Sequence, residues 1–166
     1  DTKVSLFDED RDFVLAVDYK FDSVSPQSSV MFQCYQNDGV NGFKLWNNSG
    51  AKISWGTSST NTGGMGNREM CVIRHVKGET GIHVYDSNLS GTASTYVELS
   101  KNRTTSTNAT LVFGCSKADD GAYENYASGI VYWSKLWYTD FGDNACRELV
   151  SWTHESMEFE MCGFKR

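Results

Sequence analysis

The stretch Asp12–Phe21 reads DFVLAVDYKF, and along it apolar side chains recur at every second position. Successive side chains of an extended chain point to opposite sides, so these apolar residues share one face. They are Phe13, Leu15, Val17 and Tyr19. A period of two with one apolar face is typical of a strand that covers a core, and we predict a β-strand over this stretch.

Segments of the same kind follow along the chain and are separated by short polar connectors. Roughly nine such strands imply an all-β, two-sheet antiparallel sandwich. The glycine-rich run from 56 to 66 has almost nothing to bury, and we predict a polar loop there. The predicted strands are Asp12–Phe21, Ser29–Tyr35, Gly42–Trp46, Ala51–Trp55, Glu69–Val76, Gly81–Tyr85, Thr95–Leu99, Thr110–Cys115 and Gly129–Tyr138.

The C-terminal part of the chain has a different pattern. Residues 143–152 space Ala145, Leu149 and Trp152 as on one face of a short helix. Residues 157–161 alternate again and predict a closing strand at a sheet edge. Neither an internal repeat nor a change of composition divides the chain, so we predict a single domain over residues 1–166.

The composition supports the all-β class and excludes some partners. The 166 residues include 9 Phe, 8 Tyr and 5 Trp, with 15 Gly and 1 Pro for turns. The net charge is −6 and the 15 Lys and Arg residues are scattered, which argues against a nucleic-acid partner. No apolar run approaches the roughly 20 residues of a membrane-spanning helix, so we expect no membrane partner.

Five cysteines occur, none of them in C-x-x-C spacing. Cys34, Cys71 and Cys115 lie in apolar strand-like runs, where cysteine behaves as a small buried hydrophobic residue. We therefore expect free thiols, with one or two disulfides as the alternative.

Signals of catalysis are weak. A glycosidase of this architecture needs two carboxylates on one surface, and no E-x-D-x-x-E string is present. Glu155, Glu158 and Glu160 lie in the tail with the wrong spacing, and the three histidines lack the spacing of zinc ligands. We assign no catalytic residue and favour a domain that is not an enzyme.

Residues suited to ligand binding gather near the ends of the predicted strands. Sugars are bound by exposed aromatic rings with neighbouring amides and carboxylates. A Trp at a strand end can instead close the core, and that alternative stays open here. The candidate ligand-binding residues are Trp46, Asn47, Asn48, Trp55, Asp119, Tyr123, Asn125 and Tyr126.

Two acidic turns leave calcium open as a cofactor. Asp119-Asp120 and Asn37-Asp38 offer oxygen ligands, but calcium takes six to eight oxygens from several segments. Turn chemistry alone explains both pairs, so we predict no metal site and keep calcium as the alternative.

The last strand, Gly129–Tyr138, is apolar on both faces. Alternation places Trp133, Lys135 and Trp137 on one face. Tyr132, Ser134, Leu136 and Tyr138 then form the other face. We expect one face to cover the core, and the other to pack on the tail helix, a partner subunit or a ligand.

The order of motifs resembles that of laminin-G-like (LamG) jelly rolls. An early D-F-x-x-x-x-D strand at Asp12 precedes R-E-M-C-V-I-R-H at Arg68–His75, I-H-V-Y at Ile82–Tyr85 and a terminal G-x-x-x-W-x-K-L-W-Y. NREMCVIRH and KLWYTDFGDNACRELVSWTHE (Lys135–Glu155) are more particular, and resemble LamG-like domains of bacteriophage structural and tail-associated proteins. The resemblance implies a concanavalin-A-like jelly roll and transfers no site residue.

The sequence leaves three candidate functions. The leading hypothesis is a carbohydrate-binding, adhesin-like domain of a phage structural or tail-associated protein that recognises bacterial surface or mucosal glycans. The alternative is a non-catalytic structural or oligomerisation module of a virion or fibre, which forms a homo-oligomer or attaches to other virion proteins. A glycoside hydrolase is third. The resemblance implies a protein of the virion, assembled in the bacterial cytoplasm and acting outside the cell.

Overall fold

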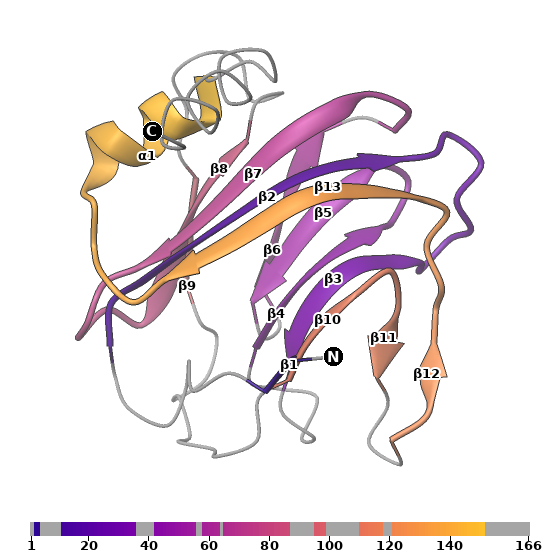
Figure 1. The fold of residues 1–166 in the computed structure, drawn as a ribbon, viewed down its shortest axis with the longest axis horizontal. Helices are drawn as coiled ribbons and strands as arrows, with labels where there is room; N and C mark the ends of the chain where they lie inside the picture. Colours follow the sequence, from indigo (N-terminus) through magenta and orange to yellow (C-terminus); the bar gives the residue numbers. More distant parts are fainter. Residues whose placement is uncertain are drawn as a thin grey trace, which may run out of the picture.

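The computed structural model describes residues 2–3, 11–35, 42–55, 58–63, 65–86, 95–98, 110–117 and 121–151. Two large antiparallel sheets pack on each other, and one helix lies outside the second sheet (Figure 1). This confirms the predicted two-sheet antiparallel sandwich with a short C-terminal helix. The predicted closing strand at 157–161 lies outside the described residues.

The six-stranded sheet has the order β1 (Thr2–Lys3), β10 (Thr110–Phe113), β3 (Val30–Tyr35), β4 (Gly42–Asn47), β5 (Ala51–Trp55) and β6 (Ser58–Gly63). The five-stranded sheet has the order β13 (Gly129–Trp137), β2 (Phe13–Phe21), β7 (Arg68–His75), β8 (Gly81–Asp86) and β9 (Thr95–Glu98). A small hairpin joins β11 (Ser116–Lys117) to β12 (Tyr123–Glu124), and the helix α1 covers Asp143–Ser151.

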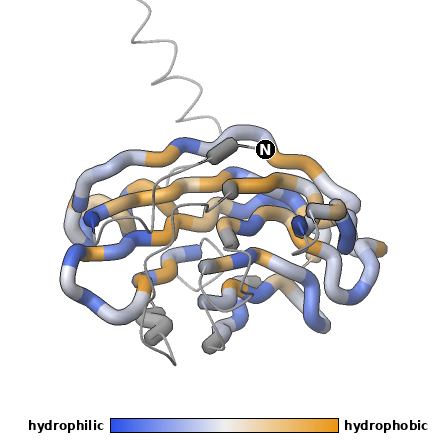
Figure 2. The backbone as a smooth tube through the Cα atoms, turned by 90° about the horizontal axis from the view of Figure 1, so that it is seen from below, coloured by the Kyte–Doolittle hydropathy of each residue, from blue (hydrophilic) through white to orange (hydrophobic). Residues whose placement is uncertain are grey.

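The main core lies between the two sheets. The four alternate residues of β2 predicted to share a face all belong to it, and the alternation of polar and apolar residues along the strands is visible in Figure 2. Phe43 and Trp55 of the six-stranded sheet meet Phe13 and His75 of the five-stranded sheet in a cluster of aromatic rings. This aromatic cluster ties the two sheets together.

A second apolar cluster lies on the outer face of the five-stranded sheet. Val14 and Ala16, the intervening residues of β2, are buried there with Cys146 and Leu149 of α1. Ala145 is exposed, so the predicted apolar helix face of Ala145, Leu149 and Trp152 is wrong at its first residue, and Trp152 lies outside the described residues. Cys146 and Leu149 are three residues apart and therefore share one face of the helix. It is this face that packs against the five-stranded sheet.

Strands β7 and β8 add Met70, Val72 and Tyr85 to this second cluster, and β13 packs against it. Trp133 and Trp137 pack against it, while Leu136 packs against the main core, as the alternation predicted. Alternation alone places Tyr132 on the same face as Leu136. A bulge in the pairing of β13 with β2, between Val131 and Trp133, shifts Tyr132 away from that face. Its ring lies 3.7 Å from the Arg68 guanidinium carbon, and the side chain is exposed. An extra residue in one strand shifts the alternation there.

The prediction of a loop over 56–66 is wrong in its centre, because β6 pairs with β5 there. An edge strand is held by backbone hydrogen bonds on one side and needs no continuous apolar face. The short strands β1, β11 and β12 were not predicted either. Two-residue strands are too short to show a period.

The described cysteines Cys34, Cys71, Cys115 and Cys146 carry free thiols and are buried. Cys34 and Cys71 belong to the main core and Cys146 to the cluster beneath α1. Within the described ranges no helix is long and apolar enough to cross a membrane.

Candidate ligand-binding face

The outer face of the six-stranded sheet carries polar and aromatic side chains. Phe43 and Leu45 of β4 point into the core, so Lys44 and Trp46 point outward. The same alternation applies to the neighbouring strands. The strand register aligns two outward rows, Gln33, Lys44, Ser54 and Ser59 in one and Val30, Trp46, Lys52 and Asn61 in the other. We call these two rows the polar face.

Lys44 and Trp46 form the centre of the polar face. The Lys44 ammonium lies 4.5 Å from the centroid of the Trp46 ring, close enough for a cation–π interaction. Partial burial lowers the pKa of Lys44, and the nearby Glu124 carboxylate opposes that shift. The ammonium is thus held in a partly desolvated position where an anion would interact with it strongly.

The β11–β12 hairpin lies beside this face, next to β10 in Figure 1. Gln33 Nε2 donates a hydrogen bond of 3.2 Å to the Lys117 carbonyl of β11. The Val30 N–H donates to the Asn125 carbonyl at 2.8 Å, just after β12. Both ends of the hairpin are therefore fastened to β3.

Asn125 shapes the segment after the hairpin. Its φ of +52° is left-handed, a conformation that Asn tolerates better than most residues. Its side-chain amide donates to Ser116 Oγ at 2.9 Å and to Glu124 Oε1 at 3.1 Å. The next residue, Tyr126, forms a β-bridge with Val30. The amide thus holds the backbone in the position from which Tyr126 extends the sheet.

Tyr126, Val30 and Trp46 consequently form one row. Val30 pairs with Trp46 on one side and with Tyr126 on the other, and directly paired residues project to the same face. Tyr126 is 64% exposed and Tyr123 is 43% exposed. The Lys117 ammonium lies 5.6 Å from the Tyr123 ring centroid. Aromatic surface and polar groups therefore occur side by side.

Two buried hydrogen-bond donors of the polar face have no partner among the described residues. They are Ser54 Oγ and Trp46 Nε1. A buried donor without a partner is destabilising by about 1–3 kcal/mol unless water or a ligand accepts from it. Both donors belong to residues that neighbour Lys44, Ser54 across the β4–β5 ladder and Trp46 two residues along β4.

Two residues that the sequence suggested for the site have structural roles instead. Trp55 is 1% exposed and stacks between Phe43 and His75 at centroid distances of 5.7 and 6.1 Å. Asn47 is buried, and its side-chain amide donates to the Ser25 and Pro26 carbonyls. We therefore leave both out of the candidate site.

The remaining suggested residues divide into three groups. The structure brings Trp46, Asn125 and Tyr126 together around Val30, with Tyr123 in the adjoining hairpin. Asn48 is half-buried in the β4–β5 turn, where its N–H donates to the Gly50 carbonyl. Asp119 lies outside the described residues, as do Asn37, Asp38 and Asp120.

Sequence reasoning missed most of the polar face itself. Lys44, Lys52 and Ser54 alternate with core residues of β4 and β5, which was a usable signal that they point outward. Ser59 and Asn61 were missed because β6 was taken for a loop. Within the described ranges, no three His, Cys, Asp or Glu side chains are grouped as a metal site would require.

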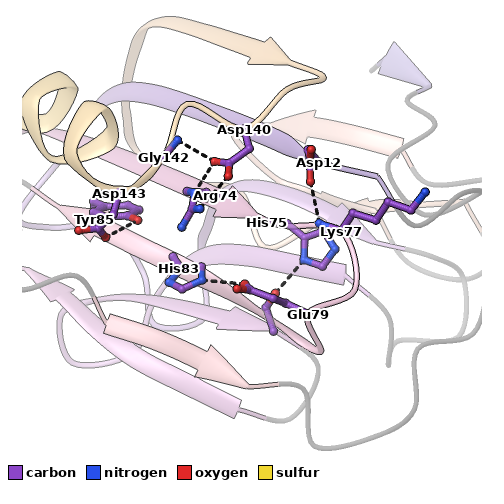
Figure 3. A network of polar contacts seen from close by, with 11 residues as sticks. Asp12, Arg74, His75, Lys77, Glu79, His83, Tyr85, Asp140, Gly142 and Asp143 are labelled. Atoms are coloured by element: carbon purple, nitrogen blue, oxygen red, sulfur yellow. Dashed lines mark hydrogen bonds and ion pairs between the residues drawn. The ribbon is translucent and has the colours of Figure 1, made fainter.

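The outer face of the five-stranded sheet carries a separate polar network (Figure 3). Arg74 forms two hydrogen bonds to the Asp140 carboxylate at 2.5 and 2.8 Å, and that carboxylate also accepts from Gly142 N–H. Tyr85 donates to Asp143 at 2.9 Å. These contacts join β7 and β8 to the segment that leads into α1, so we assign the network to fastening the helix.

We expect Asp140→Asn to lower the free energy of unfolding by about 1–2 kcal/mol at pH 7, since the amide cannot form the ion pair with Arg74. The Arg74 hydrogen bonds hold the pKa of Asp140 below its ordinary value of 3.8. This contribution is therefore complete above that ordinary value and is lost as the pH falls through the lower folded-state pKa. Urea unfolding at steps between pH 6 and pH 2 should show the difference from wild type shrinking, whereas a constant difference would contradict the assignment.

No protein-family model and no curated protein matches this chain. Among solved structures, it is similar to the CBM40 carbohydrate-binding module of Ruminococcus gnavus IT-sialidase bound to α2,3 sialyllactose. The TM-score is 0.63 at 8% identity, over 90% of this chain and 92% of that one. The same module without that ligand in its description gives the same values.

A second likeness is to the heptameric SAP-like pentraxin of Limulus polyphemus. The TM-score is 0.60 at 15% identity, over 85% of this chain and 70% of that one. At these identities the likenesses show the fold alone. Together with the two sheets of this structure, they show that the chain has a concanavalin-A-like jelly-roll fold.

Proposed function

We propose that this domain binds glycans without covalent chemistry, through the polar face and the β11–β12 hairpin. The observation that carries the proposal is the row Tyr126–Val30–Trp46, in which the exposed Tyr126 ring and the half-buried Trp46 ring flank the buried Val30, next to amides, hydroxyls and ammonium groups. Sugars present apolar ring faces and fans of hydroxyls, which aromatic rings and fixed polar groups complement.

The comparison with the CBM40 module supports the class of ligand. That module has the same fold and is described as bound to α2,3 sialyllactose. In such sandwiches the binding residues lie in loops and on outer faces, which vary independently of the core. We therefore infer the binding residues from this chain and transfer none from the CBM40 module.

We expect Tyr126→Ala to weaken glycan binding at least about 10-fold, because truncating a central aromatic contact of a binding site commonly has effects of this size. The measurement is a glycan array of bacterial capsular, cell-wall and mucin sugars probed with the labelled domain, followed by titration of the strongest ligand.

The matched control is Tyr138→Ala. Tyr138 is 50% exposed and follows β13 of the other sheet, so its loss should leave affinity unchanged. An equal loss in both variants, or no glycan bound by the wild type, would overturn the proposed function.

A structural or oligomerisation module is the second candidate, and β13 favours it. This nine-residue strand stands at the edge of the five-stranded sheet, with Ile130, Tyr132 and Tyr138 exposed along it or directly after it. Exposed apolar edge strands pair readily with another chain. Light scattering distinguishes the candidates: a stable oligomer that binds no glycan would favour this second function.

The finer role rests on the resemblance of Asn67–His75 and Lys135–Glu155 to phage LamG-like domains. We propose that the parent protein is a structural or tail-associated component of a virion, assembled in the bacterial cytoplasm, and that the domain attaches the particle to bacterial surface or mucosal glycans. Labelling of purified virions with an antibody against the domain, viewed by electron microscopy, tests this. Absence of label from all virion parts would contradict it.

A further inference from the structure

Resting on the proposed glycan-binding function, we propose that the ligands are anionic glycans, and that a carboxylate or sulfate of the sugar binds to Lys44 on the polar face. The polar face and hairpin carry charges of both signs: Lys44, Lys52 and Lys117, with Glu124 and, outside the described residues, Asp119 and Asp120 in the hairpin connection. In a surface of mixed charge on an acidic protein, an anion is recognised by local contact with one ammonium rather than by general attraction of polyanions.

The donors around Lys44 match an oxyanion. Ser54 Oγ and Trp46 Nε1 are buried donors with no partner among the described residues. Ser54 is paired with Lys44 across the β4–β5 ladder, and the Trp46 ring lies under the Lys44 ammonium. An ammonium, a hydroxyl and an indole N–H together supply several donors. A carboxylate or sulfate offers acceptors only, so the two sets are complementary.

The Lys44 side chain also determines when the aromatic surface is available. In this structure the ammonium covers one side of the Trp46 ring. When the ammonium turns toward the ligand's anion, that side of the ring becomes accessible to the sugar. Because the site is partly buried, the charge–charge interaction is screened less than on an open surface. The lowered pKa of Lys44 agrees with a cation that lacks full solvation.

The experiment compares matched sugars that differ in one charge. The probes are 3′-sialyllactose against lactose, and an oligogalacturonate against its carboxyl-reduced form. A sulfated oligosaccharide against its desulfated form separates sulfate from carboxylate as the source of the anion. Isothermal titration of the wild-type domain should show at least about 10-fold tighter binding to the anionic member of one or more pairs. Binding should weaken as NaCl rises from about 50 to about 500 mM.

The variants test Lys44 itself. Lys44→Met keeps the apolar stem and removes the charge, so it should reduce the ratio of the affinities for the anionic sugar and its neutral partner about 10-fold or more. Lys44→Arg keeps the charge and should retain most of the preference. Lys77→Met is the matched control, because Lys77 is exposed in the β7–β8 turn of the other sheet. Thermal unfolding of each variant shows whether the fold is intact.

The outcomes separate this inference from the function beneath it. Charge-dependent binding that is lost in Lys44→Met and kept in Lys77→Met supports the inference. Equal binding to both members of every pair, or equal losses for charged and neutral sugars in Lys44→Met, overturns the anionic preference and leaves the glycan-binding function standing. No binding to any sugar overturns both.

Discussion

Replacing Trp55 with alanine is expected to lower the free energy of unfolding by about 3–5 kcal/mol, the range for removal of a fully buried large aromatic side chain. Trp55 is 1% exposed and stacks almost parallel to Phe43 and His75, with interplanar angles of 11° and 16°. Because Phe43 belongs to one sheet and His75 to the other, the cavity would open at the junction of the two sheets. Urea unfolding followed by circular dichroism measures the loss.

Trp46→Ala is the matched comparison for Trp55→Ala, because it removes a tryptophan from the polar face and not from the core. The half-buried Trp46 lies on the polar face, so its removal should lower the free energy of unfolding by less than about 2 kcal/mol while weakening glycan binding. Trp55→Ala should change stability far more than affinity in the folded fraction. The reverse order of stability effects would mean that the two tryptophans have been assigned to the wrong roles.

Replacing Gly129 with alanine is expected to lower the free energy of unfolding by about 3 kcal/mol or more, the sum of steric crowding and backbone strain. A Cβ at this position would lie 2.2 Å from the Lys20 carbonyl oxygen and 2.7 Å from Met31 Cε. The backbone φ is +157°. Strands β13 and β2 would have to separate where β13 begins. The same urea unfolding experiment measures this loss.

Gly121→Ala is the matched control, because it introduces backbone strain without steric crowding. Gly121 has a φ of +87°, but a Cβ there meets nothing within 4 Å. We expect a loss of about 1 kcal/mol for this variant. Equal losses at the two glycines would contradict the close approach of the two strands. Since Gly129 follows Tyr126 by three residues, Gly129→Ala should also weaken glycan binding in the folded protein.

The long strands could be predicted from the sequence because each covers a core on at least one side. The alternation in Asp12–Phe21 identified the inward residues of β2. Along Gly129–Tyr138 it identified Leu136, but it missed the inward Val131 and grouped the exposed Tyr132 and Tyr138 with Leu136. A single bulge moved Tyr132, and the residues that cause a bulge carry no periodic signal. Strand β6 escaped prediction for a related reason: its pairing uses backbone groups, which every sequence possesses.

The candidate site was predicted in its parts but not in its assembly. Trp46 and Tyr126 were selected as aromatic residues near polar turns, yet their alignment depends on β3 lying between β4 and the segment after β12. That order is a property of the topology, which short sequence patterns do not encode. Trp55 shows the converse limit. A Trp at a strand end can point to either side, and only the register of β5 places it in the core.

Two of the buried cysteines can report how often different parts of the domain open. A thiol reacts through its thiolate, and burial raises the pKa of Cys146 to about 11 and that of Cys34 even further. At neutral pH an alkylating reagent will therefore modify these sites only during excursions that expose them. Labelling of Cys146 would time the lifting of α1, whereas labelling of Cys34 would time separation of the sheets. The ratio of the two rates would show whether the helix departs alone or only together with the sandwich.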